Sequence, residues 1–227
     1  MSNPAHKHVG VATSYLASLE VGDKLNVSVR PSHKAFHLPV DADKTPVIMV
    51  AAGSGVAPFR GFVQERAAQI AAGRTLAPAV LFYGSRHPEQ DDLYRSEFDK
   101  WEAMGAVSVR RAYSRFSDSE EGEAKGCKYV HDGIWLDRLE LITLWDKGAK
   151  VYVCGSREVG ESVKKTVVSI VVERQKRIVE AREKGELEGL PELVEGLRLE
   201  DIEVSEERAL KWFEGVRNER YATDVFD

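Results

Sequence analysis

Short apolar runs alternate with helical patterns of apolar residues along most of the chain. The run from Val47 to Ala52 contains no polar residue, which is typical of a strand buried on both faces of a sheet. Such runs predict four strands, over 46–52, 79–84, 106–112 and 149–154. The patterns that follow them predict four helices, over 58–72, 91–104, 130–145 and 158–182. This alternation predicts an α/β fold with a parallel sheet covered on both faces.

The residues before the first of these strands carry weaker patterns. Residues 10–19 have apolar side chains at helical spacing behind a threonine and a serine that can cap a helix. Residues 24–30 alternate between apolar and polar, which predicts a half-buried strand, and Phe36 and Leu38 suggest a short second one. Two strands and one small helix cannot bury a core of their own. We therefore interpret residues 1–44 as the end of a separate domain.

The last part of the chain adds one helix and one strand. Residues 183–204 are acidic and leucine-spaced, and we interpret them as a surface insertion, with a partner-docking element as the alternative. Ser205 is the expected N-cap of a helix, and residues 220–227 predict a final strand that ends on an aromatic residue. The apolar face of that helix comprises Ala209, Leu210, Trp212, Phe213 and Val216.

Composition excludes several classes of protein. A length of 227 residues allows one large or two small domains, and a net charge of -5 without a basic stripe argues against a nucleic-acid partner. Two cysteines give no disulfide framework and fit a reducing compartment, so we expect a cytoplasmic protein. No apolar run approaches the length of a membrane span. We expect no metal site, because the pair His6 and His8 lies in a polar, frayed N-terminus.

The loops that follow the predicted strands carry the candidate chemistry. Right-handed crossovers bring the loops after parallel strands to one edge of the sheet. These loops are Gly53-Ser54-Gly55, Gly84-Ser85-Arg86, Tyr113-Ser114-Arg115 and Cys154-Gly155-Ser156. Glycines let the backbone approach a phosphate, and arginines pair with it, so the edge predicts a phosphate-rich ligand. The first loop alone is weak evidence, because Ala57 or Pro58 stands where the dinucleotide fingerprint has its third glycine.

A series of motifs in a fixed order resembles a known family. The motifs are Gly10-Val11-Ala12-Thr13, AGSGVAPFRGF, FYGSR, the DDLY that begins at Asp91, YSR, YVCGS and the terminal RYATDVF. They are similar to the C-terminal part of the diflavin reductases, the ferredoxin–NADP reductase-like modules of NADPH–cytochrome P-450 reductase. The likeness extends to the reductase portion of self-sufficient cytochrome P-450 fusion monooxygenases, and it covers nearly the whole chain except roughly 175–204.

The resemblance implies a fold and a domain division. The fold is a doubly wound five-stranded parallel sheet in the order 3-2-1-4-5, preceded by a remnant of the antiparallel FAD-binding barrel. The barrel remnant would occupy residues 1–44, and the NADP(H)-binding domain residues 45–227.

The same resemblance implies an NADPH site. Ser54 and the N–H groups beside it would meet the pyrophosphate and the nicotinamide side, and Arg86 would pair with a phosphate. Ser114 and Arg115 would hold the 2'-phosphate, together with Tyr129 and a nearby lysine. Each charge-assisted hydrogen bond contributes about 1.5–3 kcal/mol, so two of them separate NADPH from NADH by roughly two to four decades. Without the family pattern, we would interpret Arg115 as a surface arginine with no ligand.

The lysine departs from the family pattern. The family has its lysine two residues before this tyrosine, where this chain has Cys127. Lys128 is adjacent to the tyrosine, and either Lys128 or Lys125 can substitute.

A second group of residues would serve hydride transfer. In the family, the residues that match Cys154 and Asp224 lie beside the nicotinamide ring, with Gly155 next in the chain. They would position the ring and stabilise charge as hydride leaves it. Phe226 matches the terminal aromatic residue, commonly tryptophan, that stacks on the flavin and must swing aside. Judged by position alone, Cys154 could instead be a small residue of the hydrophobic core, and Phe226 could simply fill space in that core.

The FAD site is implied only in part. Gly10, Val11, Ala12 and Thr13 match the loop and helix start that bind the FAD pyrophosphate. The family's Arg-x-Tyr-Ser flavin motif, the serine of the hydride-transfer group, most of the FAD barrel and the whole FMN domain have no counterpart in this chain. We therefore expect the chain to be a fragment, either an excised domain or a truncated gene product.

The resemblance implies an NADPH-binding module of an FAD- and FMN-containing oxidoreductase that passes electrons to a haem protein such as a cytochrome P-450. An alternative is an NADP(H)-binding or sensing module without flavin or electron transfer. A further alternative is a diflavin reductase that serves sulfite reduction or nitric oxide synthesis.

Overall fold

The computed structural model describes residues 10–29, 35–116, 126–186, 204–217 and 219–226. Contacts divide the chain into two compact units, Met1–Pro31 and Ser32–Asp227. No helix of the described residues is long and apolar enough to cross a membrane.

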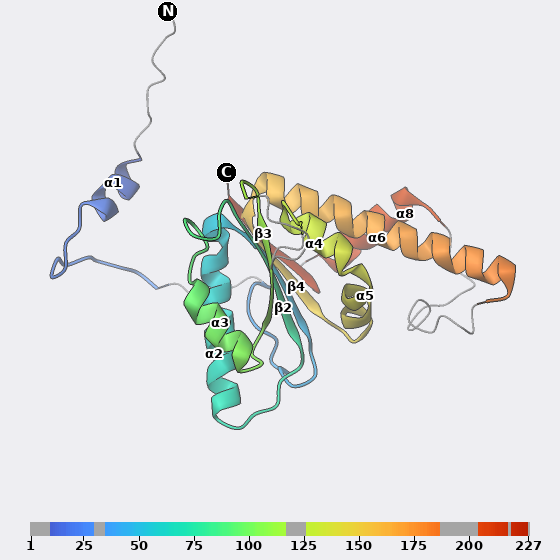
Figure 1. Cartoon of the computed structure of the whole chain (residues 1–227), viewed down its shortest axis with the longest axis horizontal. Helices are drawn as coiled ribbons and strands as arrows, with labels where there is room; N and C mark the ends of the chain where they lie inside the picture. The colour runs from blue at the N-terminus through green and yellow to red at the C-terminus, as the bar shows by residue number, and fades with distance from the viewer. Residues whose placement is uncertain (1–9, 30–34, 117–125, 187–203, 218, 227) are drawn as a thin grey trace, which may run out of the picture. The chain divides into compact units, whose positions relative to one another are not determined.

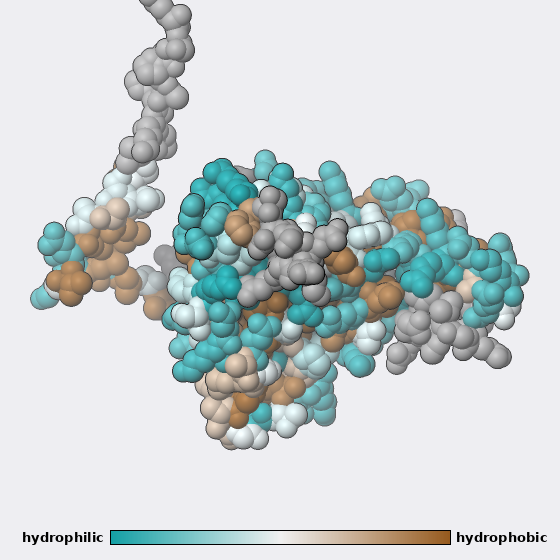
Figure 2. All heavy atoms as spheres, in the orientation of Figure 1, coloured by the Kyte–Doolittle hydropathy of each residue, from teal (hydrophilic) through white to brown (hydrophobic). Residues whose placement is uncertain are grey.

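The first unit contains the short helix α1 (Val11–Ala17), as the sequence predicted. None of the helix residues is buried, and Figure 2 shows hydrophobic side chains gathered on α1 and the segment after it. The strand predicted over 24–30 is wrong for the described residues 24–29, which are not in a sheet. A strand needs a hydrogen-bonded partner, and Val27 and Val29 are 76% and 92% exposed.

The second unit is built on a five-stranded sheet whose neighbouring strands are all parallel (Figure 1). Its strands are β1 (Val47–Ala52), β2 (Ala79–Ser85), β3 (Ser108–Tyr113), β4 (Lys150–Ser156) and β5 (Tyr221–Phe226). Their order is β3-β2-β1-β4-β5, which confirms the predicted doubly wound arrangement. No strand of a barrel remnant forms among the described residues before β1, including the second strand predicted near Phe36.

Helices cover both faces of the sheet (Figure 1). One face carries α2 (Ala57–Ala71) and α3 (Arg95–Ala103), and the short 3₁₀ helix η1 (Gly53–Val56) leads into α2. The other face carries α4 (Val130–Leu136), α5 (Arg138–Asp146), α6 (Arg157–Lys184) and α8 (Glu206–Val216).

Strand β1 shows why the fold is double-sided. Val47 and Met49 pack into the core under α2 and α3, while Ile48 and Val50 pack into the core on the opposite face. All four side chains are at most 5% exposed. A central strand is buried on both faces, which explains why this run has no polar residue.

Two helix predictions need correction. The helix predicted over 130–145 is two helices that meet at Asp137. The backbone of Asp137 is not helical, and its carboxylate accepts a hydrogen bond from Arg110 Nε at 2.7 Å. The helix predicted from residue 91 begins only at Arg95, because Tyr94 has a left-handed backbone with φ of 59°. Ser205 caps α8 as predicted, its Oγ accepting from Arg208 N at 3.3 Å. The acidic insertion lies largely outside the described residues.

Residues 35–38 pack against the rest of the second unit through aromatic contacts. The Phe36 ring centroid lies 5.4 Å from that of Tyr152 and 5.8 Å from those of Phe59 and Phe62. The Tyr152 hydroxyl donates a hydrogen bond to the carbonyl of His37. These contacts attach the segment before β1 to the sheet at β4 and α2.

Candidate functional site

A cavity of about 670 Å³ opens where β1, β2 and β3 end. Four residues of the predicted cofactor site line it, namely Arg86, Ser114, Lys128 and Tyr129. The other lining residues are Ala52, Gly53, Gly84, Ser85, Asp91, Val130, His131, Glu158, Val159 and Ser162. The structure therefore gathers the loops after β1, β2 and β3, with the starts of α4 and α6, at the edge where the sequence predicted the loops.

Backbone hydrogen bonds hold two of these loops together beyond the ends of β2 and β3. Ser114 N donates to Ser85 O at 3.0 Å, and Arg115 N donates to Arg86 O at 2.9 Å. The parallel ladder thus continues into the loops and places Ser114 beside Arg86. The Arg115 side chain is exposed and does not line the cavity.

The start of α4 supplies the lysine and tyrosine of the cavity. Asp132 accepts hydrogen bonds from the backbone N–H groups of Lys128 at 3.0 Å and Tyr129 at 2.8 Å. The Tyr129 ring stacks on His131 with 5.4 Å between centroids and 11° between planes. Cys127 is 7% exposed and buried, whereas Lys128 lines the cavity. Lys125, the other candidate, lies outside the described residues.

Sequence reasoning missed several residues of the site. Asp132, which holds the loop of Lys128 and Tyr129 but does not line the cavity, carried a signal, because an acidic residue in the first turn of a helix stabilises the free N–H groups there. His131, Glu158 and Ser162 carried none, because only the packing of α4 and α6 at the sheet edge brings them to the cavity. Glu158 places a carboxylate there, which suits the hydroxyl groups of a ribose better than a phosphate.

A second group of predicted residues meets across β4 and β5. The strand register pairs Cys154 with Asp224, Gly155 with Val225 and Ser156 with Phe226. Cys154 is 4% exposed, whereas Phe226 is 47% exposed at the end of the edge strand. Sheet order and register therefore place Cys154 and Asp224 at paired positions on neighbouring strands, and their joint role beside a cofactor stays a prediction.

Gly55 joins this second group to η1. A Cβ at Gly55 would lie 2.3 Å from the carbonyl oxygen of Cys154 and 2.7 Å from its carbonyl carbon. Only glycine allows this approach, which places the Gly53-Ser54-Gly55 loop against the end of β4. Ser54 itself is exposed.

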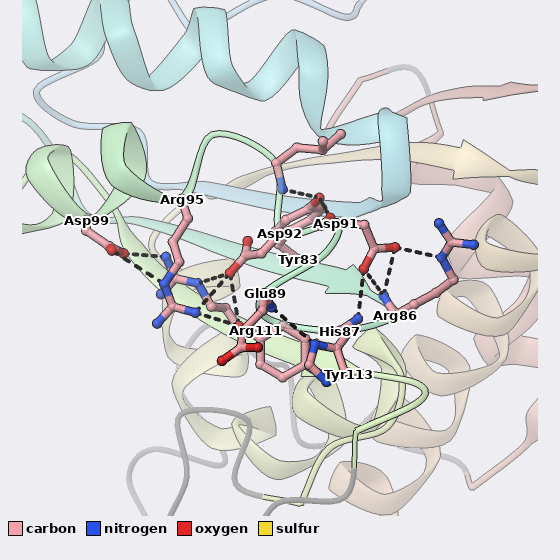
Figure 3. Close-up of polar contacts among 11 residues, drawn as sticks. Tyr83, Arg86, His87, Glu89, Asp91, Asp92, Arg95, Asp99, Arg111 and Tyr113 are labelled. Carbon is pink, nitrogen blue, oxygen red and sulfur yellow. Dashed lines mark hydrogen bonds and ion pairs between the residues drawn. The ribbon is translucent and has the colours of Figure 1, made fainter.

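A buried network of charged and hydroxyl groups supports the end of β3 (Figure 3). Asp92 has a side chain that is 1% exposed, and its carboxylate lies 3.2 Å from Arg111 Nε. Tyr113 Oη donates to Asp92 at 3.0 Å, one residue before Ser114. Burial raises the pKa of Asp92, and Arg111 and Tyr113 oppose that rise. The network ties the segment before α3 to the strand that ends at the cavity.

Another cavity, of about 600 Å³, lies under α5, α6 and α8. Its lining is mainly apolar, and its charged residues have partners, such as Arg174 with Asp146 at 2.6 Å and Arg220, whose guanidinium lies over the Trp145 ring. None of its described lining residues belongs to the loops that follow β1, β2 and β3, where the sequence predicts the phosphate site.

The residues predicted for FAD lie in the first unit. Gly10 is the N-cap of α1 in an extended conformation, and Val11, Ala12 and Thr13 form its first turn. Ser14 N donates to Gly10 O at 2.9 Å.

The parallel sheet, the glycine loop after β1 and the cation-bearing loops at its edge define an α/β dinucleotide-binding domain. Residues 49–165 match the family described as oxidoreductase NAD-binding domain, and the chain belongs to that family.

Curated relatives agree with this class. The chain is 55% identical over 221 residues to a bifunctional cytochrome P450/NADPH–P450 reductase of Fusarium oxysporum, covering 97% of this chain and 18% of the relative. It is 51% identical over 163 residues to a self-sufficient cytochrome P450 monooxygenase of Oidiodendron maius, covering 72% of this chain and 15% of the relative. The chain thus spans less than a fifth of the length of these relatives. The predicted family resemblance is confirmed.

The Cys154 thiol is expected to react slowly with alkylating agents. Burial, followed by the charge of Asp224, raises the pKa of Cys154 from 9.0 to about 11. A shift of this size leaves about a hundredfold less thiolate at neutral pH. In a Cys127→Ser background, iodoacetamide labelling of the native chain followed by mass spectrometry should show a rate midpoint well above pH 9. Labelling as fast as that of the same chain in denaturant would contradict a protected neutral thiol.

Proposed function

We propose that this chain is the NADPH-binding module of a flavin-dependent reductase. In the longer protein, the module serves hydride transfer from NADPH to FAD, and electrons then pass through FMN to a haem protein such as a cytochrome P-450. The relatives named as cytochrome P450/NADPH–P450 reductases support this acceptor over those of sulfite reduction or nitric oxide synthesis.

The observation that carries the proposal is the convergence of Arg86, Ser114, Lys128 and Tyr129 on one cavity. These residues come from the ends of β2 and β3 and from the start of α4. Cations, a hydroxyl and close-lying backbone are the groups that bind phosphates. A volume of about 670 Å³ is within the range of ligand sites.

We assign the 2'-phosphate to Ser114, Arg115 and Lys128. Ser114 and Lys128 line the cavity, and the Arg115 backbone is fixed beside Arg86. Tyr129, held flat against His131, offers an aromatic surface next to these cations.

We assign the nicotinamide side to the junction of β4, β5 and η1. When bound, NADPH supplies a hydride that FAD accepts. Cys154, as a neutral thiol, and Gly155 would shape the surface beside the ring, and Ser54 would bind the pyrophosphate on the same side. The Asp224 carboxylate would stabilise positive charge that develops there. Phe226, exposed at the end of β5, would cover the flavin until the ring arrives.

We assign the FAD pyrophosphate to Gly10, Val11, Ala12 and Thr13 at the start of α1. Residues 1–44 then belong to the FAD-binding domain and residues 45–227 to the NADP(H)-binding domain. The rest of the FAD domain and the FMN domain would lie elsewhere in the longer protein. The two cysteines of this chain form no disulfide, which suits the cytoplasm.

Calorimetric titration of the purified chain with 2',5'-ADP, and then with FAD, tests the proposal. We expect 2',5'-ADP to bind, because it carries the 2'-phosphate. Binding of FAD as well, with a yellow protein, would favour the electron-transfer module. A colourless protein that binds only 2',5'-ADP would favour an NADP(H)-binding or sensing module. Circular dichroism is the control, and a folded chain that binds neither ligand would reject the proposed site.

A further inference from the structure

Asp91 makes a dense set of hydrogen bonds at the edge of the cavity (Figure 3). Its Oδ1 accepts from the backbone N–H groups of Arg86 at 3.0 Å and His87 at 2.8 Å. Its Oδ2 accepts from Arg86 Nε at 2.7 Å. One carboxylate therefore fixes both the backbone of the loop after β2 and the side chain of its arginine.

This contact engages one edge of the Arg86 guanidinium. The carboxylate binds Nε, and Figure 3 shows the two terminal nitrogens pointing away from Asp91. The Arg86 side chain is 62% exposed, whereas that of Asp91 is 21% exposed. Asp91 thus holds Arg86 at Nε, and the two terminal nitrogens of the guanidinium are left to donate side by side to a phosphate.

Asp91 is itself held in place by its neighbours. Tyr83 Oη donates to the carbonyl oxygen of Asp91 at 3.2 Å and accepts from Leu93 N at 3.1 Å. The next residue, Asp92, is anchored to Arg111 in the buried network below β3. A carboxylate supported in this way keeps its geometry when the arginine takes a ligand.

The charge of Asp91 also needs an explanation, because it lines a cavity assigned to phosphates. An unpaired carboxylate there would repel the ligand. Burial alone would raise the pKa of Asp91, but the hydrogen bonds from Arg86 and His87 outweigh it and lower the pKa. The carboxylate is therefore ionised and paired, and its charge is directed at the arginine.

We infer that Asp91 is a positioning residue that orients Arg86 toward a phosphate of NADPH without contacting the cofactor itself. This inference rests on the proposed function. It assigns to the first aspartate of the DDLY segment a role in cofactor affinity, exerted through Arg86.

A double-mutant cycle with NADP⁺ as the probe tests this role. Calorimetry compares the wild-type chain with Asp91→Ala, Arg86→Ala and the double variant. We expect Asp91→Ala to weaken NADP⁺ binding about tenfold in the wild-type background and less than about twofold in the Arg86→Ala background. Glu89→Ala is the matched control, because it removes a carboxylate from the same loop, and we expect it to change binding less than about twofold.

The outcomes separate the inference from the proposed function. A folded wild-type chain that does not bind NADP⁺ rejects the proposed function and, with it, this inference. If the wild-type chain binds, unchanged or tighter binding by Asp91→Ala overturns the inference alone. The same fold-loss in both backgrounds would show that Asp91 only stabilises the loop, and it would overturn the inference too. Should Asp91→Ala fail to fold, Asp91→Asn, which keeps the shape of the side chain, enters the same cycle with the same expectation.

Discussion

A Gly55→Ala variant is expected to lose about 3 kcal/mol of its free energy of unfolding, as other overpacked sites do. The added methyl group would lie 2.3 Å from the carbonyl oxygen of Cys154, well inside van der Waals contact. The clash is with backbone, and Cys154 is held in register with Ala51 on β1 and with Asp224 on β5. Relief therefore requires η1 to move away from the end of β4. Urea denaturation followed by circular dichroism measures the change.

Gly61→Ala is the matched control for this substitution. Gly61 lies inside α2, and a Cβ there meets nothing within 4 Å. Alanine should stabilise the helix by about 1 kcal/mol. If both variants changed stability equally, the close contact of η1 with β4 would be rejected. We also expect Gly55→Ala to weaken NADP⁺ binding, since the displaced loop carries Ser54.

An Arg115→Ala variant is expected to weaken NADPH binding about 10- to 100-fold while NADH binding changes less than about twofold. The reason is the loss of a charge-assisted hydrogen bond to the 2'-phosphate, which contributes about 1.5–3 kcal/mol. NADH lacks that phosphate. Fluorescence titration of the purified chain with each reduced dinucleotide measures the two affinities.

Lys100→Ala provides the control, because Lys100 is an exposed cation on α3 that does not line the cavity. Its removal should change both affinities by less than about twofold. An equal loss of NADPH and NADH binding in Arg115→Ala would reject the assignment of Arg115 to the 2'-phosphate. The discrimination would then rest on Ser114 and Lys128, the candidates that line the cavity.

The sheet could be predicted from the sequence because its strands carry a strong local signal. The run from Val47 to Ala52 is apolar at every position, and only burial on both faces accounts for that. The prediction of a strand over 24–30 was wrong for a related reason. Alternation shows that a segment can form a strand, but the partner that completes the strand is a tertiary property, which residues 24–29 lack among the described residues.

The sequence could predict a site residue only where a side chain suited to binding phosphate directly follows a predicted strand. Arg86 and Ser114 follow strands directly, so topology alone placed them at one edge. His131 and Ser162 lie on α4 and α6, and their approach depends on how those helices pack. The choice between Lys125 and Lys128 was open in the sequence; Lys128 lines the cavity, and Lys125 lies outside the described residues. The break at Asp137 depends on Arg110, which is distant in sequence.

The order of the strands also bears on how fast the chain folds. Val47 of β1 pairs with Ala79 on one side and with Lys150 on the other. Closing the longer of these two loops costs about 1 kcal/mol more conformational entropy than closing the shorter one. We expect β1, β2 and β3 to associate early and β4 with β5 to join late, so that refolding is slow for a domain of this size. Mutations in β4 and β5 should then act mainly by speeding unfolding. The packing of these two strands would therefore determine how long the native state persists.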